Sequence, residues 1–97
     1  MAKLRGFEGG HTSMIYCLQL SSDGTRLYTG SWDKTVAVWD TSSGSKVRSF
    51  KGGHEHAIWC LQLSSDGTRL YTGSGDRTVA VWDTGSIVQD AENAGTI

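Results

Sequence analysis

The chain has 97 residues, 13 glycines, no proline and a formal net charge of −1. Its acids and bases are interspersed, so it offers neither the basic stripe that nucleic acid requires nor an attraction to an anionic membrane surface. No apolar run approaches the roughly 18 residues of a membrane span and no signal peptide is visible, so we expect a soluble, cytoplasmic protein.

The first expected strand covers residues 3–8, KLRGFE. This segment matches residues 46–51, KVRSFK, and the aligned positions of the N-terminal copy are Lys3, Leu4, Arg5 and Phe7. Charged and apolar residues alternate in both copies, as on a strand at the solvent-facing edge of a sheet.

A first full unit follows over residues 9–52. Short β-favouring runs predict strands at 14–20, 26–31, 35–40 and 46–51. Turn residues separate these runs, and plentiful glycine without proline suits many short strands joined by tight turns.

The expected strands of this unit are apolar on both faces. Alternation along the strand places Ile15 and Cys17 on one face and Tyr16, Leu18 and Leu20 on the other. A sheet buried on both faces must lie between two other layers. We therefore expect each unit to be stacked between neighbours.

Residues 53–83 repeat the first three strands of that unit, at 57–63, 69–74 and 78–83. Between residues 11–40 and 54–83, six of the 30 aligned positions differ, at a constant shift of 43 residues. The C-terminal residues, 84–97, contain no copy of the outer strand, and we expect a mostly disordered tail.

A fixed period of about 40–45 residues with a terminal Trp-Asp is typical of propeller blades. Trp-Asp stands at Trp39-Asp40 and Trp82-Asp83, and Gly-Gly-His opens both units at residues 9–11 and 52–54. In these motifs the chain resembles the WD-repeat β-propeller family. The resemblance implies an all-β fold of four-stranded antiparallel blades. An enzyme would need a cleft with polar residues outside the repeated positions of the blades, and the sequence shows none, so we expect no enzymatic activity and no cofactor.

The resemblance also implies a hydrogen-bonded tetrad in each blade that links an indole, a hydroxyl, an imidazole and a turn carboxylate. The matching residues are His11, Thr29, Asp33 and Trp39 in the first unit, and His54, Thr72, Asp76 and Trp82 in the second. The same residue types could form a catalytic group. Their repetition at identical positions instead favours a structural role, and we assign no catalytic residue.

Two blades cannot close a ring alone, and about three or more repeats are needed for independent stability. We therefore expect the chain to associate with itself, so that residues 3–8 complete the last blade of a neighbouring copy. Two blades per chain give even totals. Four chains and eight blades are favoured, with three chains and six blades as the alternative.

The positions that differ between the units indicate a face for protein or peptide partners, which the family commonly binds there. The candidates are Thr12, Ser13, Met14, Trp32, Glu55, His56, Ala57 and Gly75. Trp32 is the best hot-spot candidate, since large aromatic residues contribute disproportionately to binding energy. A tolerated surface tryptophan is the other interpretation.

Other chemistry has little support in the sequence. His54-Glu55-His56 suggests a metal site, but His54 belongs to the tetrad and Ser13 replaces His56 in the first unit, so no metal is expected. Cys17 and Cys60 occupy equivalent strand positions and are expected to be buried free thiols.

The function predicted from the sequence is a scaffold that self-assembles and binds proteins or peptides. The alternative is an engineered or excised repeat fragment with self-assembly as its only activity. The near-identity of the units, the short N-terminal start and the end of the repeat pattern after Asp83 favour a recently amplified or designed repeat.

Overall fold

The computed structural model describes residues 6–84, which contain seven β-strands and no helix that could span a membrane. The first unit comprises four strands: β1 (Ile15–Leu20), β2 (Arg26–Ser31), β3 (Val36–Asp40) and β4 (Lys46–Phe50). The second unit comprises β5 (Ile58–Leu63), β6 (Arg69–Ser74) and β7 (Val79–Asp83). Each strand agrees with its predicted range to within one residue at either end.

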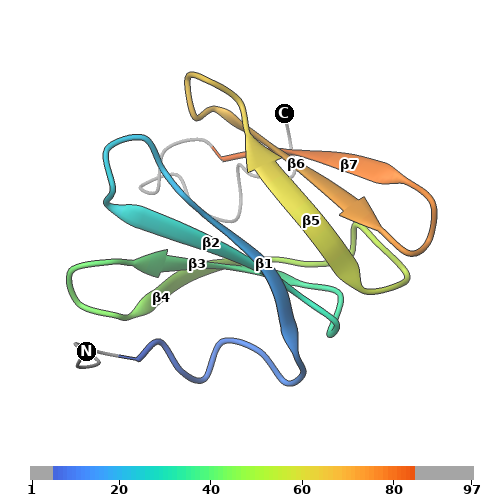
Figure 1. Cartoon of the computed structure of the whole chain (residues 1–97), viewed down its shortest axis with the longest axis horizontal. Coiled ribbons are helices and arrows are strands. Elements are labelled where there is room, and N and C mark those ends of the chain that lie inside the picture. Colours follow the sequence, from blue (N-terminus) through green and yellow to red (C-terminus); the bar gives the residue numbers. More distant parts are fainter. Residues whose placement is uncertain (1–5, 85–97) are drawn as a thin grey trace.

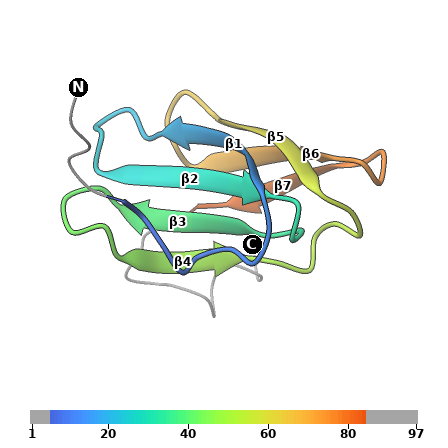
Figure 2. The same ribbon diagram turned by 60° about the horizontal axis from the view of Figure 1, so that its bottom comes forward.

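The strands form two antiparallel sheets, in the orders β1-β2-β3-β4 and β5-β6-β7. This confirms the all-β fold with one four-stranded and one three-stranded sheet. The two sheets lie against each other, with β5 next to β1 and β2 (Figures 1 and 2).

The core lies between the two sheets. Its buried members come from both units and are Tyr28, Val36, Val38, Phe50, Ile58 and Leu70. Leu61 and Leu63 of β5 pack against this cluster from the second unit, and Cys17 packs against it from the first. One face of each sheet is therefore covered within the chain.

A β-bulge in the first strand of each unit contradicts the prediction that Ile15 and Cys17 lie on the same face of the sheet. The register shifts between Ile15 and Cys17, and again between Ile58 and Cys60. An extra residue in a bulge reverses the alternation of side chains. Ile58 consequently faces the first unit, together with Leu61 and Leu63, while Cys60 faces away. The same bulge separates Ile15 from Cys17, contrary to the prediction.

At the N-terminal end, the strand predicted over residues 3–8 was expected to pair with another copy, so the single chain does not test it. Gly6, Phe7 and Glu8 form no strand within the single chain, and residues 3–5 of the predicted strand lie outside the described residues. At the other end, Thr84 is buried and its N–H donates to the Thr68 carbonyl over 3.0 Å, so the tail does not begin at this residue. Residues 85–97 lie outside the described part.

Candidate functional site

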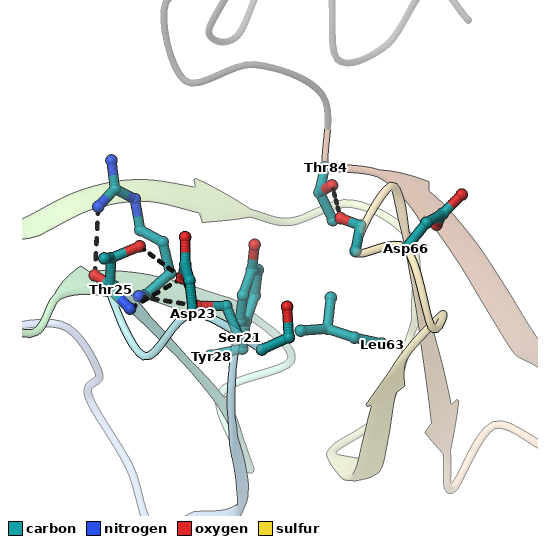
Figure 3. A pocket seen from close by; sticks show the side chains of 10 residues that line it. Ser21, Asp23, Thr25, Tyr28, Leu63, Asp66 and Thr84 are labelled. Atoms are coloured by element: carbon teal, nitrogen blue, oxygen red, sulfur yellow. Dashed lines mark hydrogen bonds between the residues drawn. The ribbon is translucent and has the colours of Figure 1, made fainter.

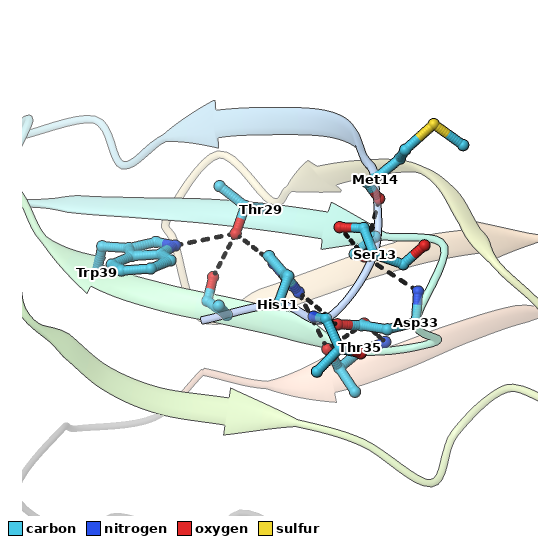
Figure 4. A network of polar contacts seen from close by, with 10 residues as sticks. His11, Ser13, Met14, Thr29, Asp33, Thr35 and Trp39 are labelled. Atoms are coloured by element: carbon cyan, nitrogen blue, oxygen red, sulfur yellow. Dashed lines mark hydrogen bonds and ion pairs between the residues drawn. The ribbon is translucent and has the colours of Figure 1, made fainter. Parts of the chain in front are cut away.

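A polar network connects the strands of the first unit (Figure 4). The Trp39 indole Nε1 donates to Thr29 Oγ1 over 2.9 Å, and Thr29 Oγ1 lies 2.8 Å from His11 Nε2. His11 Nδ1 lies 3.0 Å from a carboxylate oxygen of Asp33. Since an ionised carboxylate only accepts, His11 Nδ1 donates to Asp33, and in a neutral imidazole Nε2 then accepts from the Thr29 hydroxyl. Each polar group of this network thus has a hydrogen-bond partner.

The Asp33 carboxylate also organises the turn between β2 and β3. It accepts the Thr12 N–H over 2.9 Å, the Thr35 N–H over 2.9 Å and the Thr35 hydroxyl over 2.5 Å. Burial raises the pKa of Asp33, but these hydrogen bonds outweigh it and hold the pKa at about 2. Asp33 is therefore ionised at neutral pH and fixes the turn to the segment that precedes β1.

The second unit repeats the network. Trp82 Nε1 donates to Thr72 Oγ1 over 2.9 Å, and His54 lies 2.8 Å from Thr72 and 3.1 Å from Asp76. The structure thus brings together all eight residues of the two tetrads. Both hydroxyls, of Thr29 and Thr72, are buried. They are committed to neighbours in the network, so the arrangement holds strands together and does not present a nucleophile to a substrate.

Phe7 contacts Trp39 and Phe50 contacts the equivalent Trp82, with the first pair of rings tilted by 36° and the second stacked at 7°. The ring centroids are 5.5 Å apart in the first pair and 5.3 Å apart in the second. The glycine that precedes each histidine lies under the indole, because a Cβ at Gly10 would be 2.3 Å from the Trp39 ring. Phe7 therefore occupies, relative to the first unit, the place that Phe50 occupies relative to the second.

Three aromatic rings gather on the surface where the two units meet, and we call them the aromatic cluster: Tyr16, Trp32 and His56. Tyr16 and Trp32 meet edge to face with centroids 5.6 Å apart, and His56 lies 6.1 Å from Trp32 on the other unit. All three are exposed. Tyr16 was not among the predicted residues, and its place in the cluster depends on the bulge in β1.

The other predicted face residues divide into two groups. Thr12, Ser13, Met14 and Glu55 are exposed. Ala57 is buried and does not lie on the surface. A Cβ at Gly75 would be 2.6 Å from the His56 ring, so His56 covers Gly75. Among the described residues, no three His, Cys, Asp or Glu side chains are placed to hold a metal ion.

Each unit also leaves one apolar face uncovered. On the first unit this surface, here the leading face, comprises Ile15, Leu18 and Leu20. On the second unit it comprises Cys60, Tyr71, Val79 and Val81, here the trailing face. These side chains are all exposed. Cys60 is therefore not the buried thiol that the sequence predicted.

The leading face of the first unit is equivalent to the face of the second unit that packs in the core. The trailing face of the second unit is equivalent to the face of the first unit that packs in the core. Val79 and Val81 are 68% and 55% exposed, whereas Val36 and Val38, at the same positions of the first unit, are 0% and 1% exposed. Ile15 is 48% exposed, whereas Ile58 is 1% exposed. Residues 6–84 therefore contain one complete interface between units, here called a seam, and the two uncovered halves of a second.

A cavity of about 280 Å³ opens between the units at the turns that follow β1 and β5 (Figure 3). Its polar lining includes Ser21, Asp23, Tyr28, Asp66 and Thr84. Hydrogen bonds from Thr25 and Ser21 lower the pKa of Asp23 to about 2, and Asp66 is held at about 2 by the equivalent bonds of its own turn. These carboxylates are occupied by their turns. Arg26 also lines the cavity, and among the described residues its buried Nε has no hydrogen-bond partner.

Comparison with known proteins agrees with this architecture. The family WD40, described as "WD domain, G-beta repeat", matches residues 2–40 and 44–83. The guanine nucleotide-binding protein subunit beta of Oryza sativa subsp. indica is 46% identical over 43 residues, which are 44% of this chain and 11% of that subunit. Vegetative incompatibility protein HET-E-1 of Podospora anserina is 47% identical over 36 residues, which are 37% of this chain and 3% of that protein.

Solved structures show the same fold. The chain superimposes with a TM-score of 0.77 on the structure titled "Crystal structure of RRP9 WD40 repeats", at 26% sequence identity. The match covers 81% of this chain and 25% of that one. The structure titled "Structure of U3-55K" gives the same TM-score and coverage. This chain therefore spans only a small part of the proteins that it matches.

Proposed function

The chain belongs to the WD-repeat family, and we propose that it is a non-enzymatic scaffold that assembles with copies of itself into a closed β-propeller. One observation carries this proposal. The leading face and the trailing face are the repeats of two surfaces that already pack together inside the chain. Large exposed apolar patches on soluble proteins mark interaction sites, and here the complementary surface is present on every copy.

The open edge of the second unit supports the same assembly. The three-stranded sheet ends at β7, whereas the equivalent strand β3 pairs with β4 through Val36↔Phe50 and Ala37↔Ser49. Shifted by 43 residues, this register pairs Val79 with Phe7 and Ala80 with Gly6 of another copy. Adding a strand to an open sheet edge satisfies its unpaired backbone groups.

The two contacts run in one direction around a ring. The leading face of each copy meets the trailing face of the next, which is a heterologous interface that closes when the rotation per chain completes a circle. Four chains give eight blades, the size that we favour, and three chains give six. The absolute mass in solution decides between them.

The test of the assembly is light scattering on a sizing column, with Val79→Glu as the decisive variant. The wild type should have three or four times the chain mass of 10.5 kDa. A buried unpaired carboxylate is strongly unfavourable, so Val79→Glu should be a folded monomer. Val47→Glu, at an exposed position on β4 outside both faces, is the matched control and should assemble as the wild type does. A monomeric wild type would refute the proposal.

The assembled scaffold is proposed to present the aromatic cluster to proteins or peptides. Exposed tryptophan and tyrosine side chains are enriched among binding hot spots. A relative named as a protein subunit also supports protein partners in general. Because the cluster joins both units of one chain, each chain would carry one such site.

The binding test uses a displayed library of random peptides selected against the wild-type assembly. Selected peptides should lose most of their affinity for Trp32→Ala and keep it for Lys46→Ala, an exposed position at the end of β4 that is far from the turn holding Trp32. Equal binding to both variants would show that the aromatic cluster is not part of the peptide-binding site. If the assembly forms but selects no peptide, self-assembly is its only demonstrated activity, as the alternative hypothesis states.

A further inference from the structure

The seam inside the chain contains a knob and a hole. A Cβ at Gly30 would be 2.7 Å from Cγ2 of Ile58 and 2.7 Å from Sγ of Cys17. The Ile58 side chain from β5 therefore rests directly on the Gly30 backbone of β2. Glycine in a strand interior often marks such a close approach, because any side chain would prevent it.

The second unit has the same hole without its knob. Within the described residues, a Cβ at Gly73 would have only Cys60 Sγ nearby, at 2.8 Å. Above Gly73 lies an open recess of about 210 Å³, whose lining includes Cys60, Gln62, Tyr71 and Val79. This recess is part of the trailing face.

The matching knob is Ile15, which the bulge in β1 turns onto the leading face. Its equivalent Ile58 is almost fully buried in the hole over Gly30, whereas Ile15 itself is about half exposed. We propose that Ile15 of one copy inserts into the recess over Gly73 of the next copy. This inference rests on the proposed self-assembly and identifies the contact that sets how two copies dock.

A hydrogen bond defines the register of the same docking. Inside the chain, Gln19 Oε1 of β1 accepts the Leu63 N–H of β5 over 2.8 Å. The equivalent pair across two copies is Gln62 and Leu20. Within residues 6–84 the Gln62 side chain has no hydrogen-bond partner, and Leu20 lies on the edge strand of its sheet. The knob and this bond together allow one alignment of the two faces.

The decisive experiment is a disulfide cross-link between Ile15→Cys and the natural Cys60 of another copy. Ile58 Cβ and Cys17 Sγ lie 3.3 Å and 2.7 Å from the position that a Cβ at Gly30 would occupy. Ile15 and Cys60 are the equivalent pair between two copies, so a thiol at position 15 should reach Cys60 of the next copy. Mild oxidation of the full-length variant should give covalent dimers and larger species on a non-reducing gel, and reduction should remove them.

Matched variants establish which chains are joined. Mixing Ile15→Cys/Cys60→Ser with the wild-type chain should give covalent dimers and nothing larger, because each partner then supplies one thiol of the pair. Leu20→Cys, on the same face but displaced from the recess, should cross-link far less. Cross-linking that persists in Ile15→Cys/Cys60→Ser alone would overturn the assignment of Cys60.

Ile15→Asp tests the contact without a cross-link. The variant should retain the circular dichroism of the wild type, because Ile15 is exposed in the single chain, and its apparent mass should fall to that of a monomer. Suppose that the wild type assembles, that Ile15→Asp assembles equally well and that Ile15→Cys does not cross-link. The insertion of Ile15 into the recess would then be refuted, whereas the proposed self-assembly would stand. If the wild type is a monomer, both proposals fail.

Discussion

At the scale of single residues, the aspartates of the tight turns connect local sequence to the fold. Asp33 and Asp76 each bind a histidine, a following threonine and the N–H of the residue after that histidine. Hydrogen bonds to an ionised group are stronger than those between neutral groups. Each carboxylate therefore fixes a turn to a segment about 20 residues away in sequence.

These carboxylates predict sensitivity to acid. The pKa of Asp23, Asp33 and Asp66 is lowered to about 2 from the ordinary value of 3.8, and that of Asp76 is lowered further, mainly by the Thr78 hydroxyl. A group with a lowered folded-state pKa stabilises the fold above its unfolded pKa, and this contribution is lost as the pH falls through the folded pKa. The melting temperature should fall steeply between about pH 4 and pH 2.

Asp33→Asn tests the origin of this dependence. The amide presents one acceptor oxygen in place of a charged carboxylate, so stability at pH 7 should fall by about 1–3 kcal/mol. Thermal or urea unfolding from pH 2 to pH 7 measures both effects. A variant with unchanged stability and an unchanged pH profile would show that Asp33 does not hold the turn.

Substitutions of the two equivalent glutamines, Gln19 and Gln62, should affect folding and assembly separately. Gln19→Ala removes the bond to the Leu63 N–H inside the chain and should reduce unfolding free energy by about 0.5–1.5 kcal/mol. Gln62→Ala should leave the monomer's stability unchanged and increase its dissociation from the ring. Urea unfolding and dilution-dependent light scattering measure the two quantities. Equal effects of both variants on both quantities would contradict the docking register.

At the scale of whole elements, identical strands have different surroundings because of their position in the chain. β3 is buried between β2 and β4, whereas its copy β7 is the edge of a three-stranded sheet. The sequence VAVWD is the same in both. Within residues 6–84 no strand pairs with the outer side of β7, so this strand is an edge that chain association can complete.

Substitutions of the equivalent residues Phe7 and Phe50 test how the position in the chain changes the role of a segment. Phe50 is buried and stacks on Trp82, so Phe50→Ala should destabilise the chain itself by about 3–5 kcal/mol. Phe7 is half-buried against Trp39 of its own chain, and it is proposed to pair with Val79 of another copy. Phe7→Ala should therefore reduce the chain's own stability by about 1–3 kcal/mol and also weaken assembly. Chemical denaturation and sedimentation velocity measure the two effects. Loss of the fold in Phe7→Ala would argue that residues 3–8 serve their own chain.

At the scale of the whole molecule, two blades form one seam and leave two half-seams. Repeat proteins gain much of their stability from the interfaces between neighbouring repeats, so the isolated chain has only part of that stabilisation. Association would supply one further seam per chain.

This coupling predicts a melting temperature that rises with protein concentration. Binding to the folded state stabilises it by mass action, so the wild type should melt higher at about 100 μM than at about 1 μM. Val79→Glu should melt at the same temperature at both concentrations. Calorimetry measures the shift, and a wild type without concentration dependence would show that folding and assembly are not linked.

The sequence by itself determined the strands, the turns and the family. The 43-residue repeat, the Asp-Gly turns and the Trp-Asp motifs are local patterns, so they located every strand to within one residue and identified both sets of tetrad residues. Local propensity and turn chemistry depend on neighbours in the chain, and the sequence contains that information directly.

The tertiary structure decided which side chains share a surface. The bulges turned Ile15 away from Cys17, and the seam brought His56 to Trp32, which also contacts Tyr16. The identical valines of β3 and β7 were buried in one unit and exposed in the other. Two identical segments cannot be distinguished by their own residues. Their environments differ because each is set by what packs against it, which only the folded arrangement provides.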